Sequence, residues 1–155
     1  MKSPTLFLPV VILSMVSAGL AHATEYGNAA EAEALLDRAI GHLAVNRQQA
    51  LSDFSVRGGP FTHRDLYVLC EDMNGKILAH GGNPILVGKE TKGSELTAQF
   101  IQMASSPAGG GSVEYDWADP QTKKVARKRT LIKRAGDLFC GCLLYTSPSP
   151  RDYCA

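Results

Sequence analysis

The order of two hydrophobic periodicities most constrains the fold of this chain, because one long helical pattern precedes a series of short strand patterns. Over residues 29–51 the apolar side chains recur close to the i, i+3, i+4, i+7 spacing of one buried helix face. Asn28 is a favourable N-cap residue for this helix. Gly58, Gly59 and Pro60 cannot continue it. We therefore expect one long amphipathic helix at the start of the domain.

Strand patterns separated by turn residues fill most of the remaining chain. Between the first two strands, Asn74 and Gly75 form a favourable hairpin turn. Between the second and third, residues 95–104 carry helical apolar spacing, which predicts a second, shorter helix. The succession of helix, two strands, helix and three strands predicts an α+β domain built on an antiparallel sheet. The predicted strands are residues 65–70, 76–80, 112–117, 124–134 and 138–141.

The first 23 residues have the pattern of a secretory signal peptide. Lys2 supplies the positive charge, an apolar stretch follows, and Ala21, His22 and Ala23 form a small-x-small cleavage site. The apolar stretch is shorter than the roughly 20 residues that span a bilayer, which favours cleavage over an uncleaved membrane anchor. We expect an exported protein, periplasmic or secreted, whose mature chain begins at Thr24.

Residues 142–155 have a different expected origin. The run CLLYTSPSPRD at residues 142–152 is what a transposon-end sequencing adapter encodes when it is translated. A disordered tail rich in Pro and Ser would explain the composition of this run, but not its match to adapter codons. We therefore interpret residues 142–155 as adapter-derived and residues 24–141 as one C-terminally truncated domain.

Charge argues against nucleic acid as a partner. Lys2 and Arg151 among the 16 basic residues, and Asp152 among the 15 acidic residues, lie outside residues 24–141, which leaves this segment with no net charge. A nucleic-acid-binding domain would carry a basic excess. The positive charge is clustered instead, and such a cluster is either a solvated strand face or supplies one or two inward cations for an anionic ligand. The cluster consists of Lys123, Lys124, Arg127, Lys128, Arg129, Lys133 and Arg134.

Catalytic, metal-binding and cofactor-binding motifs are absent from the sequence. It contains no nucleophile elbow, no paired metal-ligand spacing and no phosphate-binding glycine loop. His42, His63 and His80 are too widely spaced to predict a metal site. We expect neither an enzyme nor a bound cofactor.

Six segments together resemble the single Cache domains, which are extracellular PAS-like sensor domains. The resemblance implies a five-stranded antiparallel sheet, a long helix packed on it, and a small ligand, such as an organic acid or an amino acid, held between the sheet and the elements that cover one face. In chain order the segments are ALSDF at 50–54, DLYVLC at 65–70, DMNGKILAH at 72–80, LVG at 86–88, GSVEYDW at 111–117 and GDLFCG at 136–141. Pro120 and Lys128, between the last two segments, also match.

Five residues are candidates for the ligand site. His80 can donate to a ligand carboxylate or respond to pH, or can fix the following glycine loop. Tyr115 and Trp117 share one strand face and form either a pocket wall or ordinary core packing. Lys128 can neutralise a carboxylate, and Tyr67 can line the same sheet face.

Cys70 and Cys140 are the two cysteines of residues 24–141. An even number of cysteines in an exported protein favours a disulfide. The family strand order would place the first and last strands side by side, where these residues could meet. The alternative is two small buried apolar side chains.

These features favour an exported module that reversibly binds a small organic acid or amino acid and passes the signal to a membrane-bound partner. Two alternatives remain open at this stage. The chain can be the sensing domain of a truncated chemoreceptor or histidine kinase. It can also be a structural or interaction subunit without a ligand, which a filled apolar space beneath Tyr115 and Trp117 would favour.

Overall fold

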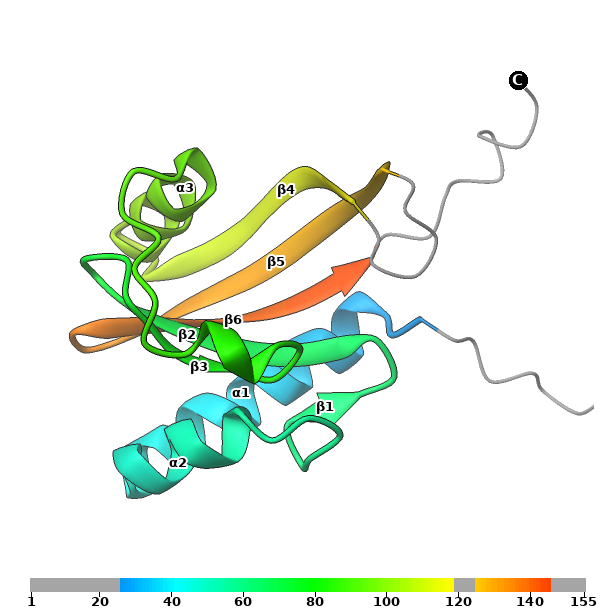
Figure 1. Ribbon diagram of the computed structural model, residues 1–155, viewed down its shortest axis with the longest axis vertical. Coiled ribbons are helices and arrows are strands. Elements are labelled where there is room, and N and C mark those ends of the chain that lie inside the picture. The colour runs from blue at the N-terminus through cyan, green and yellow to red at the C-terminus, as the bar shows by residue number, and fades with distance from the viewer. Residues whose placement is uncertain (1–25, 119–124, 146–155) are drawn as a thin grey trace, which may run out of the picture.

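A computed structural model describes residues 26–118 and 125–145 of the chain. The predicted signal peptide, the turn expected at Asp119 and Pro120, and residues 146–155 lie outside the described residues. The described part is a twisted antiparallel sheet with helices on both faces (Figure 1).

The sheet confirms the predicted α+β class and the antiparallel arrangement. Its strand order is β1-β2-β6-β5-β4. Strand β1 pairs with the start of β2, and β3 pairs with the later part of β2. The five predicted strands are present, and the short β1 is added to them. β6 continues to Tyr145, within the segment predicted to be adapter-derived. The strands are β1 (Thr62–His63), β2 (Leu66–Asp72), β3 (Ile77–His80), β4 (Gly110–Ala118), β5 (Val125–Ala135) and β6 (Leu138–Tyr145).

The expectation of one continuous helix over residues 29–51 is wrong, because the chain forms α1 (Ala29–Val45) and α2 (Arg47–Phe54) instead. Asn46 separates them: its backbone is extended, and its side chain accepts a hydrogen bond from the backbone N–H of Gln49. Asparagine favours such caps because its side chain competes for backbone hydrogen bonds. The predicted Asn28 cap is confirmed, with a capping box to Glu31.

Two further helical segments follow. The short 3-10 helix η1 (Pro84–Leu86) interrupts the loop after β3. Helix α3 (Glu95–Ala104) has the predicted bounds, and Ser94 caps its first turn.

The two faces of the sheet carry separate apolar clusters, because successive strand side chains point to opposite faces. On one face, Val68 of β2 and Cys142 of β6 pack with Leu36 of α1. On the other, Leu69 and Phe139 pack with Phe100 of α3. Figure 1 shows α1 and α2 below the sheet and α3 on the opposite side, next to β4. Tyr67 therefore faces the side that α3 covers.

Candidate functional site

Strand β5 sorts the basic cluster onto two faces of the sheet. Arg127 Nη1 lies 3.3 Å from Asp116 Oδ1, Arg129 pairs with Glu114, and Lys133 pairs with Asp37 of α1. Lys128, between two of these residues, points to the opposite face, and only 4% of its surface is exposed. The cluster therefore supplies both ion pairs and one inward cation. Lys123 and Lys124 lie outside the described residues.

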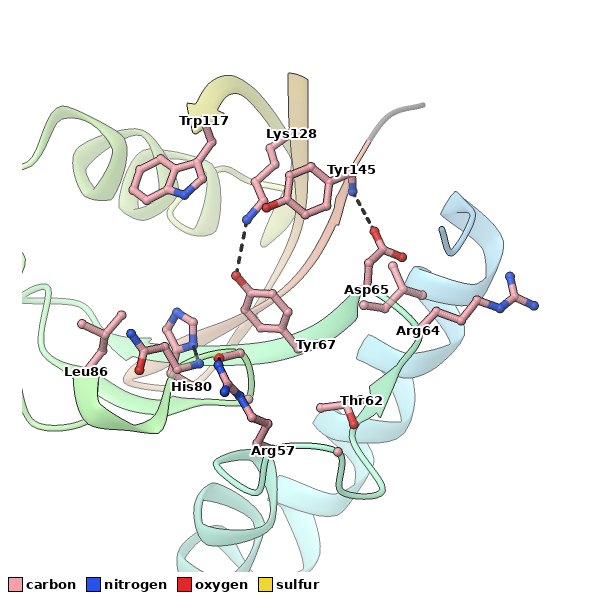
Figure 2. Close-up of a pocket in the computed structure, with 15 residues that line it drawn as sticks. Arg57, Thr62, Arg64, Asp65, Tyr67, His80, Leu86, Trp117, Lys128 and Tyr145 are labelled. Carbon is pink, nitrogen blue, oxygen red and sulfur yellow. Dashed lines mark hydrogen bonds between the residues drawn. The ribbon is translucent and has the colours of Figure 1, made fainter. Parts of the chain in front are cut away.

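The Lys128 ammonium group is surrounded by aromatic rings (Figure 2). Its Nζ lies 3.5 Å from the Tyr67 hydroxyl, 5.6 Å from the centre of the Tyr67 ring and 5.9 Å from that of Trp117. Ring faces attract a cation, and this attraction strengthens where water is scarce. A buried ammonium in such a place is a strong donor for an anion.

The outer of two cavities beside Lys128 has a volume of about 550 Å³. Tyr67, Trp117, Lys128 and His80 line it together with Leu86 of η1. Figure 2 shows His80 and Leu86 below Trp117, with Lys128 and Tyr67 beside them. The cavity therefore brings together four of the five candidate residues.

His80 has one of the two roles considered for it, that of fixing the following loop. Its Nδ1 accepts a hydrogen bond from the backbone N–H of Asn83 at 2.9 Å, which fixes the glycine loop. The neutral ring must then carry its proton on Nε2, which is left as a donor. The ring also stacks on Tyr67, with centroids 5.2 Å apart. Burial, and next the charge of Lys128, lower the pKa of His80 to about 4, so the ring is neutral at pH 7.

Acidification is expected to destabilise the fold through His80. Between pH 6.5 and about 4 the unfolded state binds a proton at this residue and the folded state does not, so stability falls as the pH decreases through this window. The loss is at most roughly 3 kcal/mol, at 1.36 kcal/mol per pKa unit. Urea unfolding between pH 7 and 4 should show a shallower pH dependence in His80→Asn, whose Oδ1 can replace the Nδ1 acceptor.

The comparison of the wild type with His80→Asn also controls for Glu71, a second buried titratable residue. Burial raises the pKa of Glu71, so this carboxyl favours the folded state at low pH and opposes the effect of His80. Because Glu71 is present in both proteins, its contribution cancels in the difference between them. Equal pH dependence in the two proteins would contradict the assigned role of His80.

The inner cavity lies between the sheet and α3 and has a volume of about 170 Å³. Tyr67, Trp117 and Lys128 line both cavities and form their junction. Tyr115 forms part of the inner wall: its hydroxyl lies 2.9 Å from Thr130 Oγ1, and its ring packs edge-on against Phe100. It is thus at once a core residue and a cavity wall, whereas Trp117 lies at the rim with 49% of its surface exposed.

Two polar residues of the inner cavity, Glu71 and Thr91, were not predicted from the sequence. Glu71 follows the segment predicted as a strand and was assigned to the turn. The structure extends β2 through Asp72, so Tyr67, Leu69 and Glu71 share one face. The period-two alternation that begins at Tyr67 is the sequence pattern that points to Glu71.

Tyr145 also lines the outer cavity, and its ring centre lies 4.4 Å from Lys128 Nζ. Its backbone N–H donates to Asp65. Tyr145 belongs to the segment predicted to be adapter-derived, whereas the candidates Tyr67, His80, Trp117 and Lys128 all precede that segment.

Cys70 and Cys140 face α1, on the side of the sheet opposite the cavities. Their sulfur atoms are joined by a disulfide of 2.01 Å, and the two residues are direct partners in the pairing of β2 with β6. Cys142 lies further along β6 as a buried free thiol. Burial raises its pKa to about 12, so it stays protonated at neutral pH.

Residues 26–118 and 125–145 contain no group of three or more His, Cys, Asp or Glu side chains placed to hold a metal ion. No helix in this part of the chain is long and apolar enough to cross a membrane.

Comparison with known proteins identifies one family. A family model described as Single Cache domain 2 matches residues 23–135. Among solved structures, a methyl-accepting chemotaxis protein from Vibrio parahaemolyticus RIMD 2210633 is similar over 76% of this chain and 88% of its own, with a TM-score of 0.59 and 19% identity. No curated protein sequence matches the chain.

Two further solved structures show the same fold at 20% identity and a TM-score of 0.55. One is a Cache chemosensory domain described by its recognition of carboxylic acid, covered over 88% of its length. The other is the periplasmic sensor domain of a chemotaxis protein, covered over 90% of its length. Each is similar over 76% of this chain. These similarities confirm the expected fold.

Proposed function

The chain belongs to the single Cache domain 2 family, and on this premise we propose that it is an exported sensor module that reversibly binds a small carboxylate. Cache domains are sensory rather than catalytic, and those of its relatives are extracellular or periplasmic. One structural neighbour is described by its recognition of carboxylic acid, which supports the same ligand class here. The carboxylate would bind at the junction of the two cavities.

The buried ammonium of Lys128 carries this proposal. With 4% of its surface exposed, Lys128 is largely shielded from bulk solvent, and there the attraction to an anion is stronger than in water. The Tyr67 hydroxyl and His80 Nε2 would add two neutral donors. A single cation with two neutral donors suits one carboxylate group.

Other basic residues near the outer cavity have bonds elsewhere. Arg57 Nη2 donates to the backbone oxygen of Gly82, and Arg64 donates to Glu31 of α1. Figure 2 shows Arg64 extending away from Lys128. Lys128, which is buried and lines both cavities, is the cation on which we expect a carboxylate to bind.

The two alternative functions, a receptor sensing domain and a subunit without a ligand, make different predictions for this site. The sensing domain of a longer receptor would bind its ligand in the same way, with α1 or the sheet edge passing the signal to a membrane-bound partner. A subunit without a ligand would have a filled apolar space beneath Tyr115 and Trp117. That space is instead a cavity lined by the charged residues Lys128 and Glu71, which favours a binding role.

Thermal unfolding with matched ligand pairs tests the proposal. Acetate, propionate, butyrate and pyruvate should each be compared with the corresponding amide, which has the same shape without the charge. At least one acid is expected to stabilise the folded protein, by roughly 2.7 kcal/mol at 100 times its Kd, so that the unfolding midpoint rises with its concentration. The corresponding amide is not expected to do so. A panel in which no small carboxylate stabilises the protein at millimolar concentration would refute the proposal.

A further inference from the structure

Glu71 is an unexpected residue for a cavity that binds an anion. Only 5% of its surface is exposed, and it lines the inner cavity. Its Oε2 lies 3.3 Å from Thr91 Oγ1, whose hydroxyl also lies 2.8 Å from the Gly75 carbonyl oxygen, and this is the one polar contact of the carboxyl within the described residues. Every fully buried side-chain polar atom of this part of the chain has a partner. Oε1 has none, so it is not fully buried, and because Glu71 lines the inner cavity we infer that this oxygen faces it.

Glu71 and Lys128 lie at separate ends of the cavity. Across the sheet, Glu71 is opposite Phe139 and Phe139 is opposite Arg134, whereas Lys128 is opposite Tyr145. The two charged residues therefore differ by several positions along the strands. Besides burial, the neighbouring Asp72 raises the pKa of Glu71, and Lys128 is not among the groups that shift it.

Apart from its charged residues, the inner cavity is lined mainly by apolar side chains, among them Leu69 of β2 and Leu96 and Phe100 of α3. The hydroxyl-bearing residues Thr91, Ser94, Thr97 and Tyr115 complete the lining. A volume of about 170 Å³ admits a short aliphatic chain. The inner cavity thus joins a carboxylate acceptor, Glu71, to a cation, Lys128, by a mainly apolar passage.

We propose that Glu71 selects a carboxylate that carries an ammonium group at its far end. This inference rests on the proposed function, because the ligand carboxylate must bind Lys128. The ammonium would donate to Oε1 of Glu71 and compensate a buried charge. An unsubstituted acid would place a methyl group against this oxygen and leave it without water or a partner, which is costly.

Matched acids with and without an amino group test this inference on the full chain. Calorimetry should compare butyrate with 4-aminobutyrate, pentanoate with 5-aminopentanoate, and hexanoate with 6-aminohexanoate. At least one amino acid is expected to bind about tenfold more tightly than its matched acid. Glu71→Gln keeps the shape and an oxygen for Thr91, and it should remove this preference. Glu90→Gln, which changes an exposed acid, should retain it.

The outcomes separate the two proposals. If no acid and no amino acid binds the wild type, the proposed function fails. If the acids bind but their amino partners bind equally or more weakly, only the selectivity inference fails. It also fails if the preference persists in Glu71→Gln. Should that variant not fold, the wild-type ratios decide, because the preference requires an acceptor for the ammonium group.

Discussion

Replacing Lys128 with methionine is expected to weaken carboxylate binding by at least about 30-fold. Removing one partner of a buried, hydrogen-bonded charge pair costs roughly 2–5 kcal/mol, and each 1.4 kcal/mol is a factor of ten in Kd. Methionine retains an unbranched chain that can pack against Tyr67 and Trp117, so the change concerns the charge more than the volume. Calorimetry with the tightest acid found for the wild type measures the loss.

Arg129→Met is the matched control for this variant. Arg129 is the next residue of β5, but it lies on the opposite face and pairs with Glu114. Its replacement removes the same charge from the same strand, and binding should stay within about threefold of the wild type, since an exposed ion pair contributes little. An unchanged affinity in Lys128→Met would show that the carboxylate does not bind at this ammonium, whatever the stability of the variant.

Strand alternation explains why much of this site could be predicted. Tyr67 and Lys128 were assigned to strands, and Tyr115 and Trp117 to one face of a strand. In an antiparallel sheet, residues on neighbouring strands come into contact when their side chains point to the same face of the sheet. What the sequence left open was which cation of the cluster turns inward, because a shift of one residue exchanges the faces. The pairing of Tyr115 with Lys128 across β4 and β5 fixes that choice.

Two features could not be predicted from the sequence pattern, the helix break at Asn46 and the burial of Glu71. The apolar stripe continues past Asn46 to Ala50, so periodicity alone gives no sign of the break. The break depends on the asparagine side chain, which caps α2 at the expense of helix continuity. Glu71 was assigned to a turn because it lies in the segment that leads to the hairpin signal of Asn74 and Gly75. Its burial depends on Thr91, a contact between distant parts of the chain that no local pattern contains.

Removing the disulfide is expected to lower the free energy of unfolding by about 4 kcal/mol. Cys70 and Cys140 are 70 residues apart in sequence, and closing a loop of this length restricts the unfolded chain by about that amount in the chain-entropy model. The loss is a large part of the 5–15 kcal/mol typical of a domain. Urea unfolding of the Cys70→Ala/Cys140→Ala double variant, compared with the oxidised wild type, measures it.

Cys142→Ala separates the cross-link from the packing of sulfur. Like Cys140, Cys142 is a fully buried residue of β6 that faces α1, but it forms no disulfide. Its replacement costs only the lost side-chain contacts, roughly 1 kcal/mol. Reductant should destabilise the wild type and Cys142→Ala but leave the double variant unchanged, because that protein has no bond to break. The expected role of the disulfide would be contradicted if each cysteine replacement lowered the free energy of unfolding by the same amount and reductant had no effect on the wild type. The strands β2 and β6 would then be held together by packing alone.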